Sequence, residues 1–326
     1  MTGVVLGVDT SNYMTSAALV SLAGEVLADR RKLLPVPSGA VGLRQSDALF
    51  LHIKQWPEVL AGVPLQGTCV KAVAVSIAPR PHAESYMPVF LAGHSFALSL
   101  AHGASVPLYT FSHQEGHLRA ALSQLHPQPK EDFLAVQMSG GTTDVLHVSP
   151  CAAGGYSLRV LAASVDLHAG QFIDRVGVAM GAEFPCGTFL DKLAENLSGA
   201  PYAIPSAVKD GEISFAGPAT AALRALERGV PREAVAAGVF RCIANSLEKV
   251  LRKSIQEHRA RTIVLCGGVA ANTHIRARLA ARMTGANFIA APLGLAGDNA
   301  VGTALLGVDR LANSQGGIFD DSNHRR

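Results

Sequence analysis

Two stretches of the chain share one pattern, in which an apolar run ends in a polar tip and a second apolar run follows. The first stretch begins at Val4–Val8 and resumes at Ser16–Val20. The second begins at Phe133–Gln137 and resumes at Val145–Val148. Short apolar runs on either side of a turn are typical of buried strands, so each stretch predicts a β-hairpin. Because the two hairpins lie far apart in the chain, we expect an internal duplication.

Both predicted tips carry groups that suit a phosphate. Glycine lets backbone N–H groups approach phosphate oxygens, and hydroxyl groups add further donors. A Gly-Gly turn without a ligand is a common alternative for the second tip taken alone, but the repetition favours a two-lobed protein that clamps a nucleotide. The tips contain Asp9, Thr10 and Ser11 in the first hairpin, and Met138, Ser139, Gly140 and Gly141 in the second.

Helical and strand patterns alternate through the rest of the chain, which predicts an α/β protein. Helical periodicity or composition marks residues 46–60, 87–101, 233–258 and 300–307, and buried strands are expected at 70–77, 107–111 and 262–266.

Composition sets outer limits on this picture. A chain of 326 residues with 48% hydrophobic and 16% charged residues can bury a large core, and its length suggests about two domains. The net charge of +3 neither requires nor excludes a polyanionic partner. The five cysteines are widely spaced, which indicates neither a disulfide framework nor a zinc knuckle. We therefore expect a globular protein of the reducing cytoplasm.

No membrane segment is expected. The chain passes directly from Met1 to an apolar strand pattern, without the basic region that starts a secretory leader. The most apolar later stretch, residues 87–109, is interrupted by His94 and His102. It is better interpreted as a buried helix followed by a strand than as a membrane span.

His113 and His117 are the first candidates for chemistry. A spacing of four residues places both imidazoles on one face of a helix, where they can share a metal ion while Glu115 points elsewhere. The alternative is that the two histidines merely flank the start of a helix. Asp298 is the obvious carboxylate to complete a site of two histidines and one acid, unless it only caps the helix that follows it.

The best nucleotide signal is a buried strand, residues 262–266, that runs into Gly267, Gly268 and then Asn272. Two glycines allow a base or ribose to lie on the backbone, and the asparagine supplies a donor and an acceptor. Close packing at the turn would explain the glycines without explaining Asn272. Asp174 and Asp191 are candidates to accept hydrogen bonds from ribose hydroxyls, and ordinary helix acids are the alternative for each.

Taken in order, the motifs resemble those of the TsaD family of tRNA adenosine threonylcarbamoyltransferases, formerly described as O-sialoglycoprotein endopeptidases or glycoproteases. The resemblance covers nearly the whole chain, and its most specific parts are the His-x-Glu-Gly-His run and the Gly-Gly-Val-Ala-Ala-Asn run. The matching segments are Gly7–Ser11, His113–His117, Ser139–Gly141, Phe172–Arg175, Pro185–Gly187, Ser214–Gly217, Gly267–Asn272 and Gly297–Asn299.

The resemblance implies an α/β fold of the two-lobed actin-like or sugar-kinase-like (ASKHA) type, with duplicated ribonuclease-H-like subdomains and a central cleft. We expect residues 1–111 to form the N-terminal lobe and residues 112–298 the C-terminal lobe. A C-terminal helix at about 299–312 is expected to pack back on the N-terminal lobe, followed by a flexible tail at 313–326.

It also implies one divalent metal ion, iron or zinc, held by His113, His117 and Asp298, and an adenine nucleotide as ligand. The implied reaction transfers a threonylcarbamoyl group from threonylcarbamoyl-AMP to N6 of the adenosine beside the tRNA anticodon. Partner proteins of that pathway or a homologous subunit, together with tRNA, are then expected, and no membrane. The implied catalytic residues are Asp9 and Ser11, and the implied nucleotide contacts are Met138, Ser139, Gly140, Gly141, Asp174, Gly187, Asp191 and Asn272.

The chain departs from the family pattern at several positions. Family members usually carry two acids after the first Thr-Ser, where this chain has Tyr13 and Met14. Thr142 replaces a common histidine, and Cys186 replaces one glycine of a pair. A divergent paralogue that binds nucleotide and metal, but acts on another acceptor or regulates a partner, is therefore the alternative. Peptidase activity is disfavoured because Glu115 does not directly follow His113, as a His-Glu-x-x-His protease requires.

Overall fold

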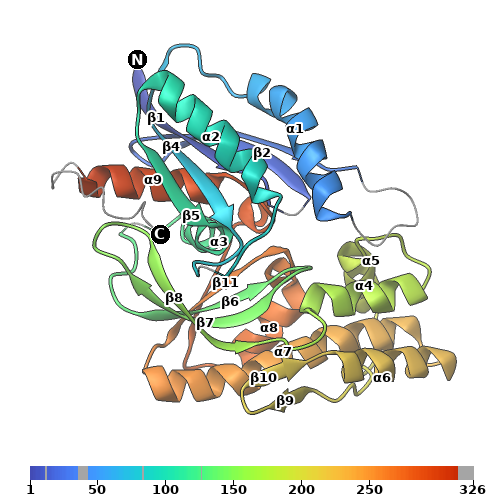
Figure 1. Ribbon diagram of the computed structural model, residues 1–326. Coiled ribbons are helices and arrows are strands. Elements are labelled where there is room, and N and C mark those ends of the chain that lie inside the picture. The colour runs from blue at the N-terminus through green and yellow to red at the C-terminus, as the bar shows by residue number, and fades with distance from the viewer. Residues whose placement is uncertain (12, 36–42, 83, 126, 315–326) are drawn as a thin grey trace. The chain divides into compact units, whose positions relative to one another are not determined.

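The computed structural model describes residues 1–11, 13–35, 43–82, 84–125 and 127–314. Their contacts divide the chain into two compact units (Figure 1). Unit 1 takes its described residues from 1–125, 150–157 and 297–314, and unit 2 from 127–149 and 158–296. The division groups residues 112–125 with the N-terminal strands, whereas the sequence prediction placed them in the C-terminal lobe. From residue 315 onward, the tail expected at 313–326 lies outside the described residues.

Unit 1 contains a mixed five-stranded sheet in the order β3-β2-β1-β4-β5. The first three strands form an antiparallel meander, and the last two run parallel to β1. The predicted first hairpin is thereby confirmed. The strands are β1 (Thr2–Asp9), β2 (Met14–Ser21), β3 (Val26–Leu33), β4 (Thr68–Ala78) and β5 (Leu108–Ser112).

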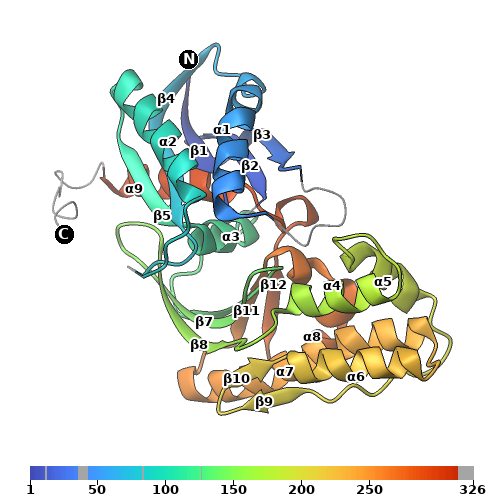
Figure 2. The same cartoon turned by 45° about the vertical axis from the view of Figure 1, so that its right-hand side comes forward.

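Alternation along β1 explains how helices cover both faces of this sheet. Val4, Leu6 and Val8 pack in one core with α1 (Gln45–Ala61) and α2 (Phe90–Ala104). Val5 and Gly7 point the other way, toward α9 (Val301–Ser314). Successive side chains of a strand alternate between faces, so the wholly apolar run predicts burial on both sides. Figures 1 and 2 show α1 and α2 on one face and α9 on the other.

Unit 2 repeats the same topology. Its sheet has the order β12-β11-β6-β7-β8, in which β6 and β7 are antiparallel and β11 and β12 continue parallel to β6. Strand by strand, this order matches that of unit 1, which confirms the duplication predicted from the two hairpin patterns. The strands are β6 (Phe133–Met138), β7 (Thr143–Pro150), β8 (Tyr156–Ala163), β11 (Thr262–Cys266) and β12 (Asn287–Ala290).

The core of unit 2 consists of aromatic and aliphatic side chains from its helices and its sheet. Phe172, Phe215 and Phe240 are fully buried, and the rings of the first two stack with centroids 5.5 Å apart. Besides these helices there is a small β9–β10 ribbon. The elements are α4 (Ala169–Ala179), α5 (Gly187–Glu195), β9 (Ala207–Lys209), β10 (Glu212–Ser214), α6 (Ala216–Glu227), α7 (Arg232–His258), η1 (Gly268–Ala271), α8 (Thr273–Arg282) and η2 (Leu293–Leu295).

Within the described part of the chain, no helix combines the length and the apolar character needed to cross a bilayer. The apolar stretch at 87–109 forms α2 and the start of β5, as the sequence predicts.

Candidate metal centre and nucleotide-binding elements

The first element of the candidate metal centre is α3 (His113–Ala121), which starts directly after β5. Ser112 and Glu115 form a capping box: Ser112 Oγ accepts the Glu115 N–H at 3.2 Å, and Glu115 Oε2 accepts the Ser112 N–H at 2.8 Å. The carboxylate of Glu115 is therefore turned back to the helix start. As expected from the sequence, it points away from the histidine pair.

His113 and His117 lie on one face of α3, with ring centroids 4.3 Å apart. Asp298 Oδ1 lies 3.2 Å from Nε2 of His117 and 3.4 Å from Nε2 of His113. The candidate ligand atoms of the three residues all lie within 4.8 Å of one another. The structure thus brings together, inside unit 1, the three residues that the sequence selected as metal ligands.

Asp298 is available for this role because its neighbour serves the helix. Asn299 Oδ1 accepts the N–H of Gly302 at 3.1 Å in the first turn of α9. Asn299 Nδ2 donates to the carbonyl oxygen of Gly297 at 2.8 Å. The cap that sequence reasoning offered as an alternative role for Asp298 is therefore supplied by Asn299.

The crossing of α3 and α9 depends on glycine. A Cβ built on Gly302 would lie 1.8 Å from the carbonyl oxygen of Gly116, so the two backbones touch. This contact fixes the helix that carries the histidines against the helix that follows Asp298. Sequence reasoning assigned no role to Gly302 or Asn299, although the small residues of the segment 300–307 were a visible signal of close packing.

A buried carboxylate binds the ring nitrogen of His113 that faces away from Asp298. Asp9, at the end of β1, is fully buried, and its Oδ2 accepts a hydrogen bond from Nδ1 of His113 at 2.9 Å. Its Oδ1 accepts the N–H of Ser11 at 2.9 Å and also the Ser11 hydroxyl. With Nδ1 bonded to Asp9, Nε2 faces the Asp298 side. There it can give up its proton to bind an ion, as in other metal sites with a carboxylate behind a histidine. The tip residues Asp9 and Ser11 thus lie next to the candidate metal ligands.

The charged carboxylates of Asp9 and Asp298 and the protonated ring of His113 stabilise one another. Burial lowers the pKa of His113, but the carboxylates of Asp9 and Asp298 overcome that effect and raise it to about 10. Burial alone would raise the pKa of Asp298, yet hydrogen bonds from His113 and His117 hold it well below its usual range. The pKa of Asp9 is likewise lowered by His113 despite burial. The site therefore has two carboxylates that stay ionised, and their charges favour the protonated form of His113.

The departures at Tyr13 and Met14 lie at the tip of the β1–β2 hairpin. The N–H of Met14 donates to the carbonyl oxygen of Ser11 at 3.0 Å, which closes the turn. Both residues are half-buried, and Met14 pairs with Leu33 in the sheet. The described residues of β1 and β2 thus keep their antiparallel pairing up to Asp9 and Ser16, without the acids that the family usually carries at the tip.

In unit 2, the tip between β6 and β7 packs directly on the start of α4. Ser139 Oγ accepts the N–H of Gly141 at 3.2 Å, and the carbonyl oxygen of Ser139 accepts the N–H of Gly170 at 3.2 Å. A Cβ on Gly170 would lie 2.7 Å from Cα of Gly140, so this approach requires glycine. Gly140 and Gly141 are exposed. An exposed glycine tip beside a helix N-terminus is suited to a phosphate group.

The other predicted nucleotide residues form linked pairs in the same unit. Asp174 Oδ1 accepts the N–H of Cys186 at 2.8 Å, which places α4 beside Gly187 at the start of α5. Asn272 Nδ2 donates to Asp191 Oδ1, and Asn272 Oδ1 caps α8 by accepting the N–H of Ile275 at 2.9 Å. Burial raises the pKa of both Asp174 and Asp191. Asn272 thus has a structural role that sequence reasoning did not find.

Close packing explains one glycine of the Gly267-Gly268 pair. Gly267 has φ +91°, and a Cβ there would lie 2.3 Å from the carbonyl oxygen of Met138. Gly268 has no such neighbour. Met138 itself is buried, so its backbone, and not its side chain, borders this turn.

Comparisons with known proteins agree on one family. The model of the family described as "TsaD: tRNA N6-adenosine threonylcarbamoyltransferase" matches residues 71–305. The tRNA N6-adenosine threonylcarbamoyltransferase of a Thermus thermophilus strain is 32% identical over 310 residues, which cover 92% of this chain and 91% of that protein. The enzyme of the same name from Caulobacter vibrioides is 38% identical over 239 residues, 69% of this chain and 62% of that protein.

Solved structures share the fold at low identity. Component A of the (R)-2-hydroxyglutaryl-CoA dehydratase of Acidaminococcus fermentans has a TM-score of 0.58 at 17% identity, covering 95% of this chain and 99% of that chain. A ROK family glucokinase from Streptomyces griseus has a TM-score of 0.52 at 15% identity, covering 93% and 98%. The HypF protein of T. kodakarensis has a TM-score of 0.62 at 13% identity, covering 95% and 48%. The predicted ASKHA fold is confirmed.

Proposed function

This chain belongs to the TsaD family of tRNA N6-adenosine threonylcarbamoyltransferases, and we propose that it transfers a threonylcarbamoyl group from threonylcarbamoyl-AMP to N6 of the adenosine beside the tRNA anticodon. The family is one of enzymes. The observation that carries the proposal is the convergence of His113, His117 and Asp298 on one point, with Asp9 behind His113. A reaction on tRNA implies a cytoplasmic location.

The donor set fits one divalent metal ion. Two imidazole nitrogens and one carboxylate oxygen suit iron or zinc, and three protein ligands leave positions open for a substrate. When bound, the ion would supply a Lewis acid for the carbamoyl carbonyl. Asp9 would hold the His113 ring so that Nε2 faces the ion, and Ser11 would hold Asp9. Asn299 would leave Asp298 free to bind.

Unit 2 would hold the adenine nucleotide. The exposed tip at Ser139–Gly141 and the N-terminus of α4 offer backbone donors to the phosphate. Asp174, Asp191 and Asn272 remain the proposed ribose and base contacts. In the transfer, N6 attacks the carbamoyl carbon, the bond from that carbon to the phosphate oxygen breaks, and AMP leaves while N6 loses a proton.

A protein partner is part of the proposal. Apolar side chains are exposed on two adjacent helices that cover one face of the unit 1 sheet: Phe50 and Ile53 on α1, and Leu91 and Leu98 on α2. Exposed apolar side chains gathered on one face are typical of protein interfaces. We assign this face to a pathway partner or a homologous subunit.

The second candidate function is that of a divergent paralogue, which would bind the metal and nucleotide but use another acceptor or regulate a partner. The observation that favours it is the pair Tyr13 and Met14 at the hairpin tip beside Asp9 and Ser11.

Reconstitution separates the two functions. The full chain is incubated with partner proteins, threonine, bicarbonate, ATP and an unmodified tRNA, and labelled threonine in tRNA is counted. Incorporation supports the transferase. No incorporation by a protein that has bound metal and nucleotide supports the paralogue, and gain of incorporation in a Tyr13→Asp/Met14→Glu double variant would assign the loss to the missing acids.

A further inference from the structure

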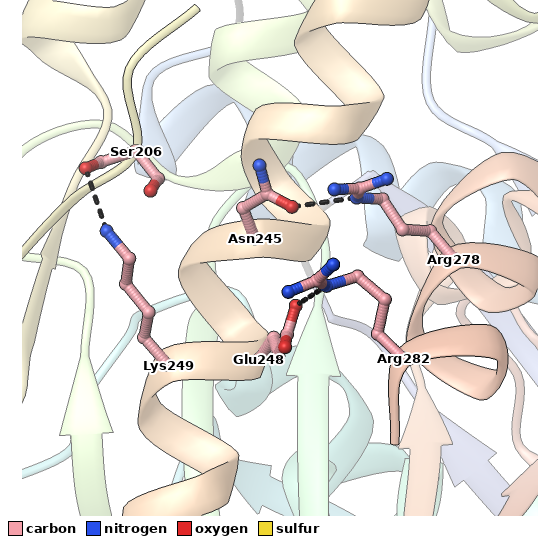
Figure 3. Close-up of a pocket in the computed structure, with 6 residues that line it drawn as sticks. All are labelled: Ser206, Asn245, Glu248, Lys249, Arg278 and Arg282. Carbon is pink, nitrogen blue, oxygen red and sulfur yellow. Dashed lines mark hydrogen bonds and ion pairs between the residues drawn. The ribbon is translucent and has the colours of Figure 1, made fainter. Parts of the chain in front are cut away.

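A basic pocket lies on the surface of unit 2, and none of its lining residues is a candidate metal or nucleotide residue. It has a volume of about 240 Å³ and lies between α7, α8 and the segment that precedes β9. Figure 3 shows Arg278 and Arg282 reaching from α8 toward α7, while Lys249 extends from α7 toward Ser206. Its lining residues are Ser206, Asn245, Glu248, Lys249, Arg278 and Arg282.

Positive charge exceeds negative charge in this pocket. Glu248 is the only acid among the described lining residues, and both of its oxygens are engaged. Its Oε1 accepts from Arg252 Nε at 2.9 Å, and its Oε2 accepts from Arg282 Nε. Arg252 also donates to the carbonyl oxygen of Arg282, so its role is to join the two helices.

Arg278 forms no ion pair with any described residue, because Glu248 is paired with Arg252 and Arg282. Its Nε donates to the neutral side-chain oxygen of Asn245 at 2.7 Å. Across the described residues, no acid pairs with Arg278, and its terminal amino groups have no hydrogen-bond partner. Partial burial and the like charges of Arg282 and Arg241 lower its pKa, whereas the charge of Glu248 acts in the opposite direction. A half-buried guanidinium with free donors is ready to bind an anion.

The shape of the pocket selects the kind of anion. Its volume is below the roughly 300–1,000 Å³ of pockets that enclose a small molecule, and its lining residues include no aromatic or aliphatic side chain on which a base could stack. A planar guanidinium binds phosphate oxygens in pairs, and Lys249 adds a second cation at the rim. The site thus suits a single phosphate group carried by a larger molecule that crosses the surface.

We propose that this pocket binds a backbone phosphate of RNA, with Arg278 as the main contact and Lys249 as the second. The choice of RNA as the polyanion rests on the proposed function. Binding at the pocket is independent of base sequence and depends on salt, because it reads only the phosphate.

The test measures binding of an unmodified tRNA to the full chain at several salt concentrations, without any transfer reaction. We expect Arg278→Gln to weaken binding about 3- to 10-fold and to reduce the slope of log K against log salt by about 1. Arg278→Lys retains the charge but not the planar fork, so its binding should be intermediate. Arg228→Gln, on the exposed end of α6, makes the same charge change away from the pocket and should bind as the wild type does.

Lys249→Gln keeps the test decisive if Arg278→Gln does not fold, because Lys249 is exposed. It should weaken tRNA binding about 2-fold or more and leave the far-UV circular dichroism unchanged. Equal binding by wild type and the pocket variants, or no binding by any of them, would overturn the inference. The inference would also be overturned if Arg278→Gln weakened the binding of inorganic phosphate but left the affinity for tRNA unchanged. If the wild type shows transfer activity and Arg278→Gln binds tRNA as the wild type does, this inference fails and the proposed function stands. If Arg278→Gln weakens tRNA binding but the wild type shows no transfer activity, only the proposed function fails.

Discussion

Asp9 and His113 are 104 positions apart in the chain, yet Asp9 Oδ2 accepts a hydrogen bond from His113 Nδ1 at 2.9 Å. The end of β1 and the start of α3 meet here, because β5 delivers the chain to the same edge of the sheet at which β1 ends. The imidazole is therefore held in one orientation before any ion binds.

Asp9→Asn should weaken metal binding about 10- to 100-fold, since partners behind a metal-binding histidine have effects of this size. The amide can present an N–H to Nδ1 and move the ring proton to Nε2, the atom that must face the ion. Competition titration with a chelator measures the affinity. Asp29→Asn, which removes an acid paired with Arg31 on β3, is the matched control, and an unchanged affinity in Asp9→Asn would remove the orienting role.

Purified protein should contain about one iron or zinc ion, and His113→Ala and Asp298→Ala should each lose it. Each change deletes one of three ligands that converge within 4.8 Å. Elemental analysis of the purified variants gives the content. His102→Ala, an exposed histidine on α2, should keep the ion. Full metal content in either ligand variant would contradict the site.

In the metal-free protein, the contribution of His113 to the free energy of unfolding should fall as the pH rises. The folded pKa of His113 is raised from 6.5 to about 10, so its protonated form is favoured by folding. This contribution is fully present below about pH 6.5 and disappears as the pH approaches 10. With a chelator present, the difference in unfolding free energy between wild type and His113→Gln should shrink over that range. A difference that stays constant would show that the two carboxylates do not stabilise the charged ring.

Gly302→Ala should destabilise unit 1 by about 2–3 kcal/mol or more and reduce metal binding, because a Cβ there meets the Gly116 carbonyl oxygen. Urea unfolding and metal content measure the two effects. Gly297→Ala is the matched control, since a Cβ at that position has no neighbour within 4 Å. If both variants behave alike, the α3–α9 contact does not position the site.

Much of this structure could be predicted from local sequence patterns. The two apolar runs at Val4–Val8 and Phe133–Gln137 sufficed to predict both hairpins and their duplication, since burial on both faces leaves an unbroken apolar run. The spacing of His113 and His117 sufficed to place both rings on one helix face. These features depend only on the spacing of residue types along a strand or a helix, which can be read directly from the sequence.

Long-range pairings were less accessible. The hydrogen bond from His113 to Asp9, and that from Asn272 to Asp191, depend on sheet order and helix crossing, which no local period encodes. Asn299 and Asp298 are adjacent and equally able to cap a helix, and only the start of α9 at Val301 decides between them. Whether the residues of unit 2 hold a nucleotide stays a prediction.

The order of synthesis has a consequence for the candidate metal centre. His117 precedes Asp298 by 181 residues, and almost all of unit 2 is encoded between them. Until α9 emerges from the ribosome, Val5 and Gly7 on β1 lack the helix that covers them, and the two histidines lack their carboxylate. In a nascent chain, the three residues of the candidate site can therefore come together only after almost all of unit 2 has been made.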